Sequence, residues 1–233
     1  MSVARRTRLT FFVDVDNTLL DNDAAKREMD RRMAVLIGKR GSERFWEVYE
    51  EVRAETTMVD IPRTLARYSA ELSDQATRFL LADLFMRFPF AQFLFPGTPA
   101  TVAHLRTLGG VAILSDGDAI FQTAKIIRSG LAAAVDGYAH VYAHKEEHLD
   151  ELTGAFPADH YVLIDDKPEV ITKVAARLTA PLTTVFVRQG KYAAKAPSGN
   201  WTGAGLTVES IGDVRAIDIG AYVAVGRGTI DRT

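Results

Sequence analysis

Residues 9–18 read LTFFVDVDNT, and this stretch decides the fold that we expect for the chain. Its first five residues are mainly β-branched and aromatic, which is typical of a buried strand. Asp14 and Asp16 follow at once, so we expect the strand to end at Val13. A strand of this kind places carboxylates at the carboxyl edge of a sheet, which is where open parallel sheets bind ligands.

After this strand, the sequence changes to long helical stretches over 23–88. Apolar residues recur at helical spacing in 28–37 and in 45–52, and a further helix start is indicated at 73–74. No convincing strand pattern interrupts this block. We therefore expect an all-helical insert after the first strand.

Beyond Pro96 and Gly97, helical and strand patterns alternate. The expected strands are 111–114, 138–142, 161–164 and 183–187, and the expected helices are 98–108, 119–128, 146–152 and 169–178. This alternation predicts parallel pairing through right-handed crossovers, and therefore a doubly wound α/β fold. A loop over 196–205, a short last strand and a C-terminal helix should complete the chain. The expected domains are an α/β core of residues 1–21 and 91–233 and an α-helical cap of residues 22–90.

The composition excludes several classes of site. With 28 basic and 30 acidic side chains, the formal net charge is −2, which argues against a surface that binds nucleic acid. The chain has no cysteine, so disulfides, zinc–thiolate sites, iron–sulfur clusters and a thiol nucleophile are excluded. Charged residues interrupt the apolar runs well before the about 18–20 residues that a membrane span needs. Asp14 also ends the first apolar run too early for an export signal, so we expect a cytoplasmic protein.

Polar side chains follow four of the expected strands. They are Asp14, Asp16 and Thr18 after the first, Ser115 after the second, Lys145 after the third, and Asp165 and Asp166 after the fourth. A single acid at a strand end is often a helix cap, but packing does not explain the whole set. Because the carboxyl ends of parallel strands meet at one edge of a sheet, we expect these side chains to converge.

The spacing of the first two acids favours a bound cation. Asp14 and Asp16 lie two residues apart, so their side chains point to one side of an extended segment. Carboxylates so close repel each other unless a cation lies beside them. Mg²⁺ suits this arrangement, since it binds one or two carboxylates together with phosphate oxygens and water. Further acids come from Asp165 and Asp166, and groups suited to phosphoryl oxygens come from Thr18, Ser115 and Lys145.

These segments resemble the four motifs of the haloacid dehalogenase (HAD) superfamily of phosphotransferases. Residues 14–18 resemble the first motif, 113–115 the second, Lys145 the third and 162–166 the fourth. The motifs occur in the family's order and spacing, and the helical insert lies where the family's C1-type cap belongs. The resemblance implies a HAD-like, Rossmannoid core with an inserted cap, and a Mg²⁺-dependent hydrolase of phosphoric monoesters.

The resemblance also implies roles for the acids. Asp14 would be the nucleophile that forms an aspartyl-phosphate, and Asp16 would be the general acid and then the general base. The metal would be bound by the Asp14 carboxylate, the backbone carbonyl of Asp16 and an acid of the fourth motif. We align Asp166 with that acid and Asp165 with the place that glycine often takes, although either could contact the ion.

For the phosphoryl group, the resemblance implies Ser115 and Lys145 as ligands, with Thr18 supporting the first-motif loop. Lys125 and Lys167 compete with Lys145 for the third-motif role. Lys145 is favoured because it follows a strand end, whereas Lys125 is expected well along a helix and pointing away from the crevice.

The residue at position 16 discriminates between activities of the superfamily. Dehalogenases of this group carry no aspartate there, because a halide leaves without a proton. Phosphonate-cleaving members also differ there and need a Schiff-base lysine in the cap, where this chain has only Lys26 and Lys39, neither in an obviously apolar setting. We therefore expect a phosphatase that acts on a small phosphorylated metabolite.

The alternatives are a phosphomutase of sugar phosphates and a non-catalytic binding protein of the same fold. The identity of the substrate, the oligomeric state and the roles of Arg188 and Lys191 stay open.

Overall fold

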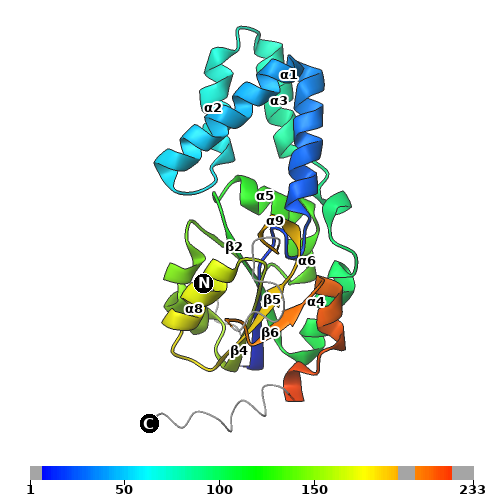
Figure 1. Cartoon of the computed structure of the whole chain (residues 1–233), viewed down its shortest axis with the longest axis vertical. Coiled ribbons are helices and arrows are strands. Elements are labelled where there is room, and N and C mark those ends of the chain that lie inside the picture. The colour runs from blue at the N-terminus through cyan, green and yellow to red at the C-terminus, as the bar shows by residue number, and fades with distance from the viewer. Residues whose placement is uncertain (1–6, 194–202, 222–233) are drawn as a thin grey trace. The chain divides into compact units, whose positions relative to one another are not determined.

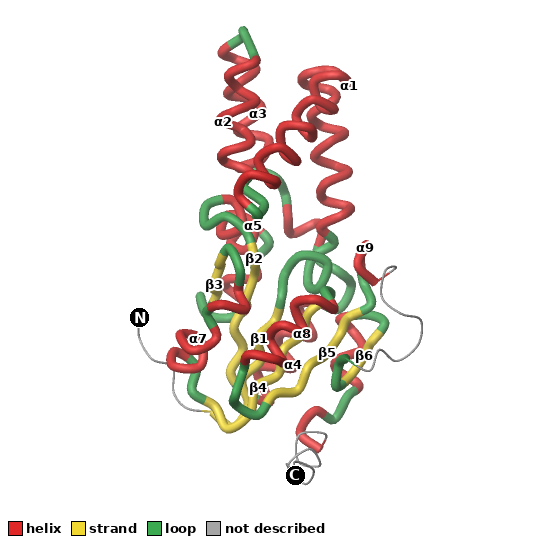
Figure 2. The backbone as a smooth tube through the Cα atoms, turned by 60° about the vertical axis from the view of Figure 1, so that its left-hand side comes forward, coloured by secondary structure: helices red, strands yellow, loops and turns green. Residues whose placement is uncertain are grey.

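A computed structural model of the protein describes residues 7–193 and 203–221. Within these residues the strands form one six-stranded sheet in the order β3-β2-β1-β4-β5-β6. The strands are β1 (Thr7–Val13), β2 (Gly110–Asp116), β3 (Ala139–Tyr142), β4 (Ala158–Asp165), β5 (Leu182–Val187) and β6 (Leu206–Val208). Figure 2 shows β1, β4, β5 and β6 side by side. The parallel α/β architecture expected from the sequence is confirmed.

The centre of the sheet is β1, which pairs in parallel with β2 on one side and with β4 on the other. Val13 is the partner of Ile113 in β2 and of Ile164 in β4. Further parallel pairs join β4 to β5 and β5 to β6. The order along the sheet therefore reverses between β1 and β4, which is the position where open α/β sheets bind ligands.

Contacts divide the chain into two compact units. The described residues of the first unit are 7–20, 95–113, 146–193 and 203–221. The second unit contains 21–94 and 114–145, so it holds the last residues of β2 together with β3. The cap boundaries 22–90 stay a prediction.

In the first unit, helices fill the connections between the strands. They are α4 (Thr98–Leu108), α7 (Leu149–Ala155), α8 (Pro168–Arg177) and α9 (Gly190–Ala193), with the 3₁₀ helix η3 (Ile211–Ala216). Helix α8 packs on β4 and β5, and α4 packs on η3. Phe12 of β1 stacks on Tyr161 of β4 with ring centroids 5.6 Å apart, and both side chains are buried. The two rings therefore pack together on one face of the sheet, across the β1–β4 pair.

The second unit is mostly helical. Besides β3 and the last residues of β2, it contains α1 (Asn22–Thr56), α2 (Ile61–Glu71), α3 (Gln75–Met86), the 3₁₀ helix η1 (Phe90–Phe93), α5 (Phe121–Arg128) and α6 (Leu131–Ala134). Helix α1 packs against α2 and α3 (Figure 1). Phe45 is at the centre of this packing, with its ring centroid 5.0 Å from that of Phe85 and 5.5 Å from that of Tyr68. These three side chains are buried and form the core of the insert.

Helix α1 changes direction at Gly38. This residue has φ 74° and ψ 163°, a conformation that a residue with a side chain rarely adopts. Figure 1 shows the two parts of α1 running in different directions. The predicted helical stretches 28–37 and 45–52 are thus parts of one bent helix. None of the helices in the described part of the chain has the length and hydropathy needed to cross a membrane.

Other predicted elements differ in their ends. The helix expected at 119–128 begins at Phe121, and the one expected at 146–152 is divided into the 3₁₀ helix η2 (Lys145–Glu147) and α7. The predicted start at 73–74 is confirmed, since the Asp74 carboxylate accepts the amides of Ala76 and Thr77 at the beginning of α3. The predicted loop 196–205 lies largely outside the described residues, and the C-terminal helix lies partly outside them.

Candidate functional site

The pairing of β1 with β4 brings three acidic residues of the first unit together. The amide of Asp14 donates a hydrogen bond of 2.9 Å to the carbonyl of Ile164, directly after the pair formed by Val13 and Ile164. Asp14 follows the end of β1, Asp165 is the last residue of β4, and Asp166 comes next. Because the strands are parallel, these acids meet at one edge of the sheet, as the sequence predicted.

The three acids form a compact, buried cluster. Asp14, Asp165 and Asp166 each offer one carboxylate oxygen, and these oxygens lie within 4.8 Å of one another. Octahedral Mg²⁺ with bonds of about 2.1 Å holds adjacent ligands about 3 Å apart and opposite ligands about 4.2 Å apart. The cluster is close to that spacing, and its donors are all carboxylate oxygens, which hard divalent cations prefer. The residues present therefore fit a site for such a cation.

The loop after β1 is held by a tight set of hydrogen bonds. The amide of Leu20 donates to the carbonyl of Val15 at 2.9 Å, and the amide of Asn17 donates to the carbonyl of Leu20 at 2.7 Å. Asn17 has φ 63°, a left-handed conformation that asparagine tolerates better than most residues. This turn places Thr18 against Asp14, where Thr18 Oγ1 donates to Asp14 Oδ2 at 3.2 Å. Both side chains are buried, so Thr18 supports the Asp14 carboxylate directly.

Asp16 differs from Asp14 in its surroundings. Its side chain is partly exposed, whereas Asp14 is almost completely buried. The Asp16 carboxylate does not belong to the three-acid cluster found among the described residues. A partly exposed carboxylate beside a buried one is suited to exchanging protons with a substrate, because general acid–base groups must reach the atoms that they protonate.

Ser115 lies in the second unit, one residue before the end of β2. Gln122 Nε2, in the first turn of α5, donates a hydrogen bond of 2.8 Å to Ser115 Oγ, and both side chains are buried. Since Oγ accepts this hydrogen bond, the hydroxyl proton can be donated elsewhere, as a phosphoryl oxygen would require. Gln122 was not predicted from the sequence, because an inward-facing residue of a helix carries no signal that identifies its partner.

Lys145 belongs to the second unit as well, and its side chain is completely buried. Its Nζ donates to the carbonyl of Leu114 at 3.3 Å, and its backbone amide donates to Asp116 Oδ1 at 2.9 Å. Leu114 and Asp116 are the neighbours of Ser115 in β2. The residues that resemble the second and third motifs are therefore brought together. Fully buried lysines are rare unless they are paired or functional.

The two competing lysines have other surroundings. Because α5 begins at Phe121, Lys125 lies in its second turn and is buried, and not far along a helix as expected. Lys125 Nζ donates to Asn22 Oδ1 at 3.1 Å and lies 5.6 Å from the centroid of the Phe121 ring. In the first unit, the backbone amide of Lys167 donates to Asp165 Oδ1 at 2.8 Å. Lys145 is the lysine whose contacts lie on either side of Ser115, and its third-motif role stays a prediction.

Asp118 is a second buried polar residue that the sequence did not single out. Its Oδ1 accepts the amides of Phe121 at 2.6 Å and of Ile120 at 3.0 Å, at the start of α5. The amide of Asp118 donates to the carbonyl of Val59 at 3.2 Å. Burial raises the pKa of Asp118 and the charge of Asp60 raises it further, although the backbone amides act in the opposite direction. Asp118 thus joins α5 to the segment that precedes α2.

Lys26 lies in an aromatic setting, which the sequence did not reveal. Its Nζ donates to Tyr49 Oη at 2.8 Å and lies 4.5 Å from the centroid of the Tyr49 ring and 5.8 Å from that of Trp46. The bend at Gly38 allows this contact between residues 23 positions apart. The expectation that Lys26 has no apolar surroundings is therefore wrong.

The two cations that follow β5 contact neighbouring side chains of the first unit. Arg188 Nη1 lies 3.7 Å from Glu209 Oε1, and Lys191 Nζ lies 5.3 Å from the ring centroid of Tyr192. Arg188 thus joins β5 to the residue that follows β6. Their part in binding a substrate stays open.

Comparison with known proteins gives a consistent result. Residues 9–188 match the haloacid dehalogenase-like hydrolase family. A haloacid dehalogenase-like hydrolase from Burkholderia xenovorans LB400 is 38% identical, with a TM-score of 0.82, and the alignment covers 92% of this chain and 98% of that chain. No curated protein matches the sequence.

More distant solved structures share the fold. A haloacid dehalogenase-like hydrolase from Xanthomonas campestris is 15% identical, with a TM-score of 0.64 over 98% of this chain and 99% of that chain. The L-2-haloacid dehalogenase from Xanthobacter autotrophicus with chloropropionic acid covalently bound is 17% identical, with a TM-score of 0.56 over 96% and 99%. The HAD-hydrolase YfnB from Bacillus subtilis bound to magnesium is 16% identical, with a TM-score of 0.56 over 91% and 98%. At these identities the likeness concerns the fold alone.

Proposed function

This chain belongs to the haloacid dehalogenase-like hydrolase family, and from that premise we propose that it is a Mg²⁺-dependent phosphatase of a small phosphorylated metabolite. The reaction would pass through an aspartyl-phosphate on Asp14. The observation that carries this proposal is the combination of the buried Asp14, Asp165 and Asp166 cluster with a fourth acid, Asp16, two residues after Asp14. An all-oxygen cation site and a proton donor serve the transfer of an anionic phosphoryl group to a carboxylate.

In the first half of the reaction, an oxygen of the Asp14 carboxylate attacks phosphorus. The bond between phosphorus and the ester oxygen breaks, and Asp16 gives its proton to the leaving alkoxide. In the second half, Asp16 takes a proton from water, the resulting hydroxide attacks phosphorus, and the bond to Asp14 breaks with release of inorganic phosphate. Covalent catalysis divides one difficult displacement into two easier ones.

The other residues would hold the groups that react. Thr18, through its hydrogen bond to Asp14 Oδ2, keeps one carboxylate oxygen engaged and the other oriented. Ser115, whose Oγ accepts from Gln122, would donate its proton to a phosphoryl oxygen, and Lys145 would supply positive charge. A divalent cation held by Asp14 and the fourth-motif acids, with the Asp16 carbonyl, would offset the negative charge of the carboxylates and the phosphoryl group.

Hydrolysis of 2-haloacids is the competing activity, because relatives of the same fold are named as L-2-haloacid dehalogenases. Asp16 argues against it, since a departing halide needs no proton and the resembling dehalogenases lack an aspartate at this position. In the phosphomutase alternative, a sugar hydroxyl accepts the phosphoryl group from Asp14, whereas in the phosphatase water accepts it. A non-catalytic binding protein would not require all of these residues.

The test is a screen of the purified protein against a panel of phosphate monoesters and 2-haloacids, with Mg²⁺ or with EDTA. Released phosphate and released halide are measured in parallel, and D14N is the matched control. We expect phosphate release from at least one ester with Mg²⁺, its loss in EDTA and its loss in D14N. Halide release without phosphate release would overturn the proposal. Interconversion of a hexose phosphate without free phosphate would favour the mutase, and inactivity on the whole panel would favour a binding protein.

A further inference from the structure

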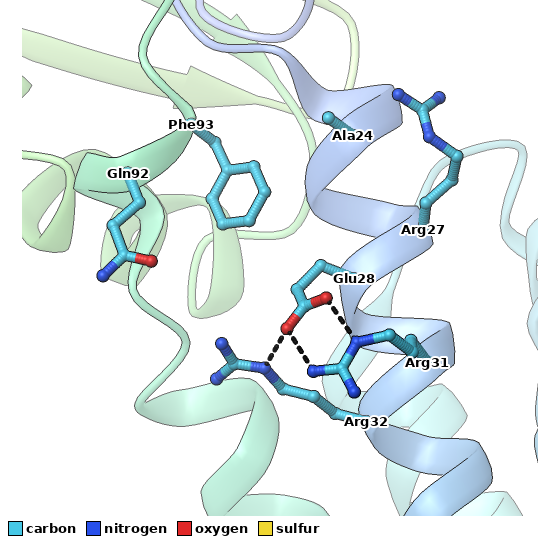
Figure 3. A pocket seen from close by; sticks show the side chains of 7 residues that line it. All are labelled: Ala24, Arg27, Glu28, Arg31, Arg32, Gln92 and Phe93. Carbon is cyan, nitrogen blue, oxygen red and sulfur yellow. Dashed lines mark hydrogen bonds and ion pairs between the residues drawn. The ribbon is translucent and has the colours of Figure 1, made fainter.

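A groove in the second unit is lined by one face of α1. Ala24, Glu28 and Arg31 recur at intervals of three or four residues, so they lie on the same side of the helix. Gln92 and Phe93 of η1 form the opposite wall, as Figure 3 shows. The groove has a volume of about 360 Å³. Its remaining residues are Arg27 and Arg32.

A backbone hydrogen bond and an aromatic contact hold the walls of the groove in place. The amide of Asp21, which caps α1, donates a hydrogen bond of 2.8 Å to the carbonyl of Phe93. The Phe93 ring stacks on Phe88, whose side chain is completely buried, with centroids 5.2 Å apart. The wall opposite α1 is therefore anchored in the core of this unit.

The charges of the groove do not balance. Its lining contains the guanidinium groups of Arg27, Arg31 and Arg32 but a single carboxylate, that of Glu28, so its formal charge is +2. The hydrogen bonds from Arg31 and Arg32 lower the pKa of Glu28 to about 2, so this carboxylate is ionised at neutral pH. An anion that enters the groove therefore meets two positive charges that Glu28 does not neutralise.

Two of the guanidinium groups are already oriented. Arg31 binds Glu28 through Nε and Nη2, each at 2.8 Å, and Arg32 Nε binds Glu28 Oε1 at 2.7 Å (Figure 3). Arg32 also lies over the Phe88 ring, with Cζ 5.2 Å from its centroid. A guanidinium has five N–H donors, so three remain on Arg31 and four on Arg32 after these hydrogen bonds. The guanidinium group of Arg27 has no ion pair or hydrogen bond with another side chain among the described residues.

We propose that this groove, lined by Arg27, Arg31, Arg32 and Phe93, binds a small organic anion that carries a phosphate or phosphonate group beside an apolar part. The planar forks of Arg31 and Arg32 match the tetrahedral oxygens of such a group, and arginine binds them through paired hydrogen bonds. Phe93 provides the apolar surface that the remainder of the ligand contacts. The groove is formed by residues of the second unit alone, whereas Asp14, Asp165 and Asp166 belong to the first, and binding there does not depend on the proposed phosphatase activity.

The experiment titrates the full chain with phenylphosphonate, which carries both parts and has no ester bond to hydrolyse. EDTA is present so that no divalent cation supports binding at the Asp14 cluster. Affinity is measured by calorimetry, and the arginine Nε–H resonances are followed by NMR. We expect the resonances of Arg31 and Arg32 to shift, and inorganic phosphate, which lacks the ring, to bind more weakly than phenylphosphonate.

Variants identify the site and the mode of binding. R31Q/R32Q should weaken binding by about tenfold or more, because two charge-assisted contacts are lost. R53Q is the matched control, since Arg53 also lies on α1 and pairs with an acid three residues away, Glu50, at 3.5 Å, but outside the groove. R31K/R32K keeps the charge and loses the fork, so its affinity should fall between those of the wild type and R31Q/R32Q.

Three results would overturn the proposal. They are no measurable binding of phenylphosphonate to the wild type at millimolar concentration, equal affinity of R31Q/R32Q and the wild type, and equal affinity of R31K/R32K and the wild type. The last result would mean that charge alone attracts the anion. If R31Q/R32Q does not fold, as judged by circular dichroism, the lysine variant and the shifts of the wild-type arginine resonances decide the question.

Discussion

The amide of Asp14 donates a hydrogen bond of 2.9 Å to the carbonyl of Ile164, which continues the parallel ladder between β1 and β4 by one step. This contact fixes the position of Asp14 relative to the end of β4, where Asp165 and Asp166 follow. A slip of one residue in this pairing would turn the side chains to the other face of the sheet. The cluster of three carboxylates is therefore a consequence of backbone register.

The three-acid cluster predicts that D166N changes the melting temperature differently without and with Mg²⁺. D166N removes one of three neighbouring negative charges, so in EDTA we expect a melting temperature equal to or above that of the wild type. Mg²⁺ at about 100 times its dissociation constant should stabilise the wild type by about 2.7 kcal/mol, which corresponds to roughly 5–10 °C. D166N should lose most of this increase. Thermal unfolding followed by circular dichroism, in EDTA and over a range of Mg²⁺ concentrations, measures both effects.

The control for this prediction is D159N. Asp159 lies on the same strand, β4, but its side chain is exposed and outside the cluster. D159N should keep the Mg²⁺-induced increase in melting temperature. An undiminished increase in D166N would contradict the assignment of Asp166 as a ligand, and the same measurement on D165N would then show whether Asp165 has that role.

The sequence was sufficient to predict the sheet and this cluster. The run that ends at Val13 is apolar enough to indicate a buried strand, and the alternation after Gly97 requires parallel neighbours. Once strands are parallel, the residues that follow them must meet at one edge, so the convergence of Asp14 with Asp165 and Asp166 follows from topology.

Contacts that depend on tertiary packing were not predictable in this way. Lys26 meets Tyr49 because the chain turns back at Gly38, and no local pattern reports the angle of that turn. Likewise, Gln122 of α5 contacts Ser115 of β2, and Lys125 of α5 contacts Asn22 at the start of α1. Periodicity identifies the inward face of a helix, but it does not identify which distant residue that face will meet.

Gly190 lies against the loop that follows β1, so a larger residue at this position should disturb that loop. It has φ +65°, and a Cβ at this position would overlap the side chain of Asn17, for example at 2.7 Å from Nδ2. G190A should therefore displace Asn17, which lies between Asp16 and Thr18. We expect this to lower both the stability of the protein and its catalytic rate. Urea unfolding and steady-state kinetics on the substrate identified by the screen measure the two quantities.

Gly130 provides the matched control for G190A. It has φ +82°, but no atom lies within 4 Å of the position that an alanine methyl group would take, so G130A has the backbone strain of about 1–2 kcal/mol without the overlap. G130A should lose stability and keep its catalytic rate. Equal rates for G190A and the wild type would show that the contact with Asn17 does not influence the site.

Asp118 predicts a dependence of stability on pH. Burial raises its pKa in the folded protein above the unfolded value of 3.8, so the folded state binds more protons in the interval between the two values. The contribution of Asp118 to stability must then fall as the pH rises through that interval. D118N keeps an oxygen acceptor for the amides of Ile120 and Phe121 without the charge, so it should gain stability relative to the wild type between about pH 4 and about pH 7. Urea unfolding at the two pH values measures the difference.

The control for D118N is D118A, which removes the charge and the acceptor together. It should be less stable than D118N by about 1 kcal/mol at both pH values, because the amides at the start of α5 lose their partner. A stability difference between D118N and the wild type that does not change with pH would contradict a raised pKa of Asp118.

Asp16 provides the prediction that separates ester hydrolysis from dehalogenation. An alkoxide leaves phosphorus with difficulty unless it receives a proton, whereas an aryloxide such as p-nitrophenolate leaves as a stable anion. If Asp16 is the general acid, D16N should reduce the hydrolysis of an alkyl phosphate by about 10²–10⁴-fold and the release of p-nitrophenolate by much less.

Because D16N also lacks the base that activates water, part of the protein should retain a phosphoryl group on Asp14, which mass spectrometry of acid-quenched samples detects. Rapid quenching with both substrates measures the two steps separately, and D14N should show neither. Equal losses for both leaving groups would exclude proton donation by Asp16, and 2-haloacid turnover unaffected by D16N would assign Asp14 to attack on carbon.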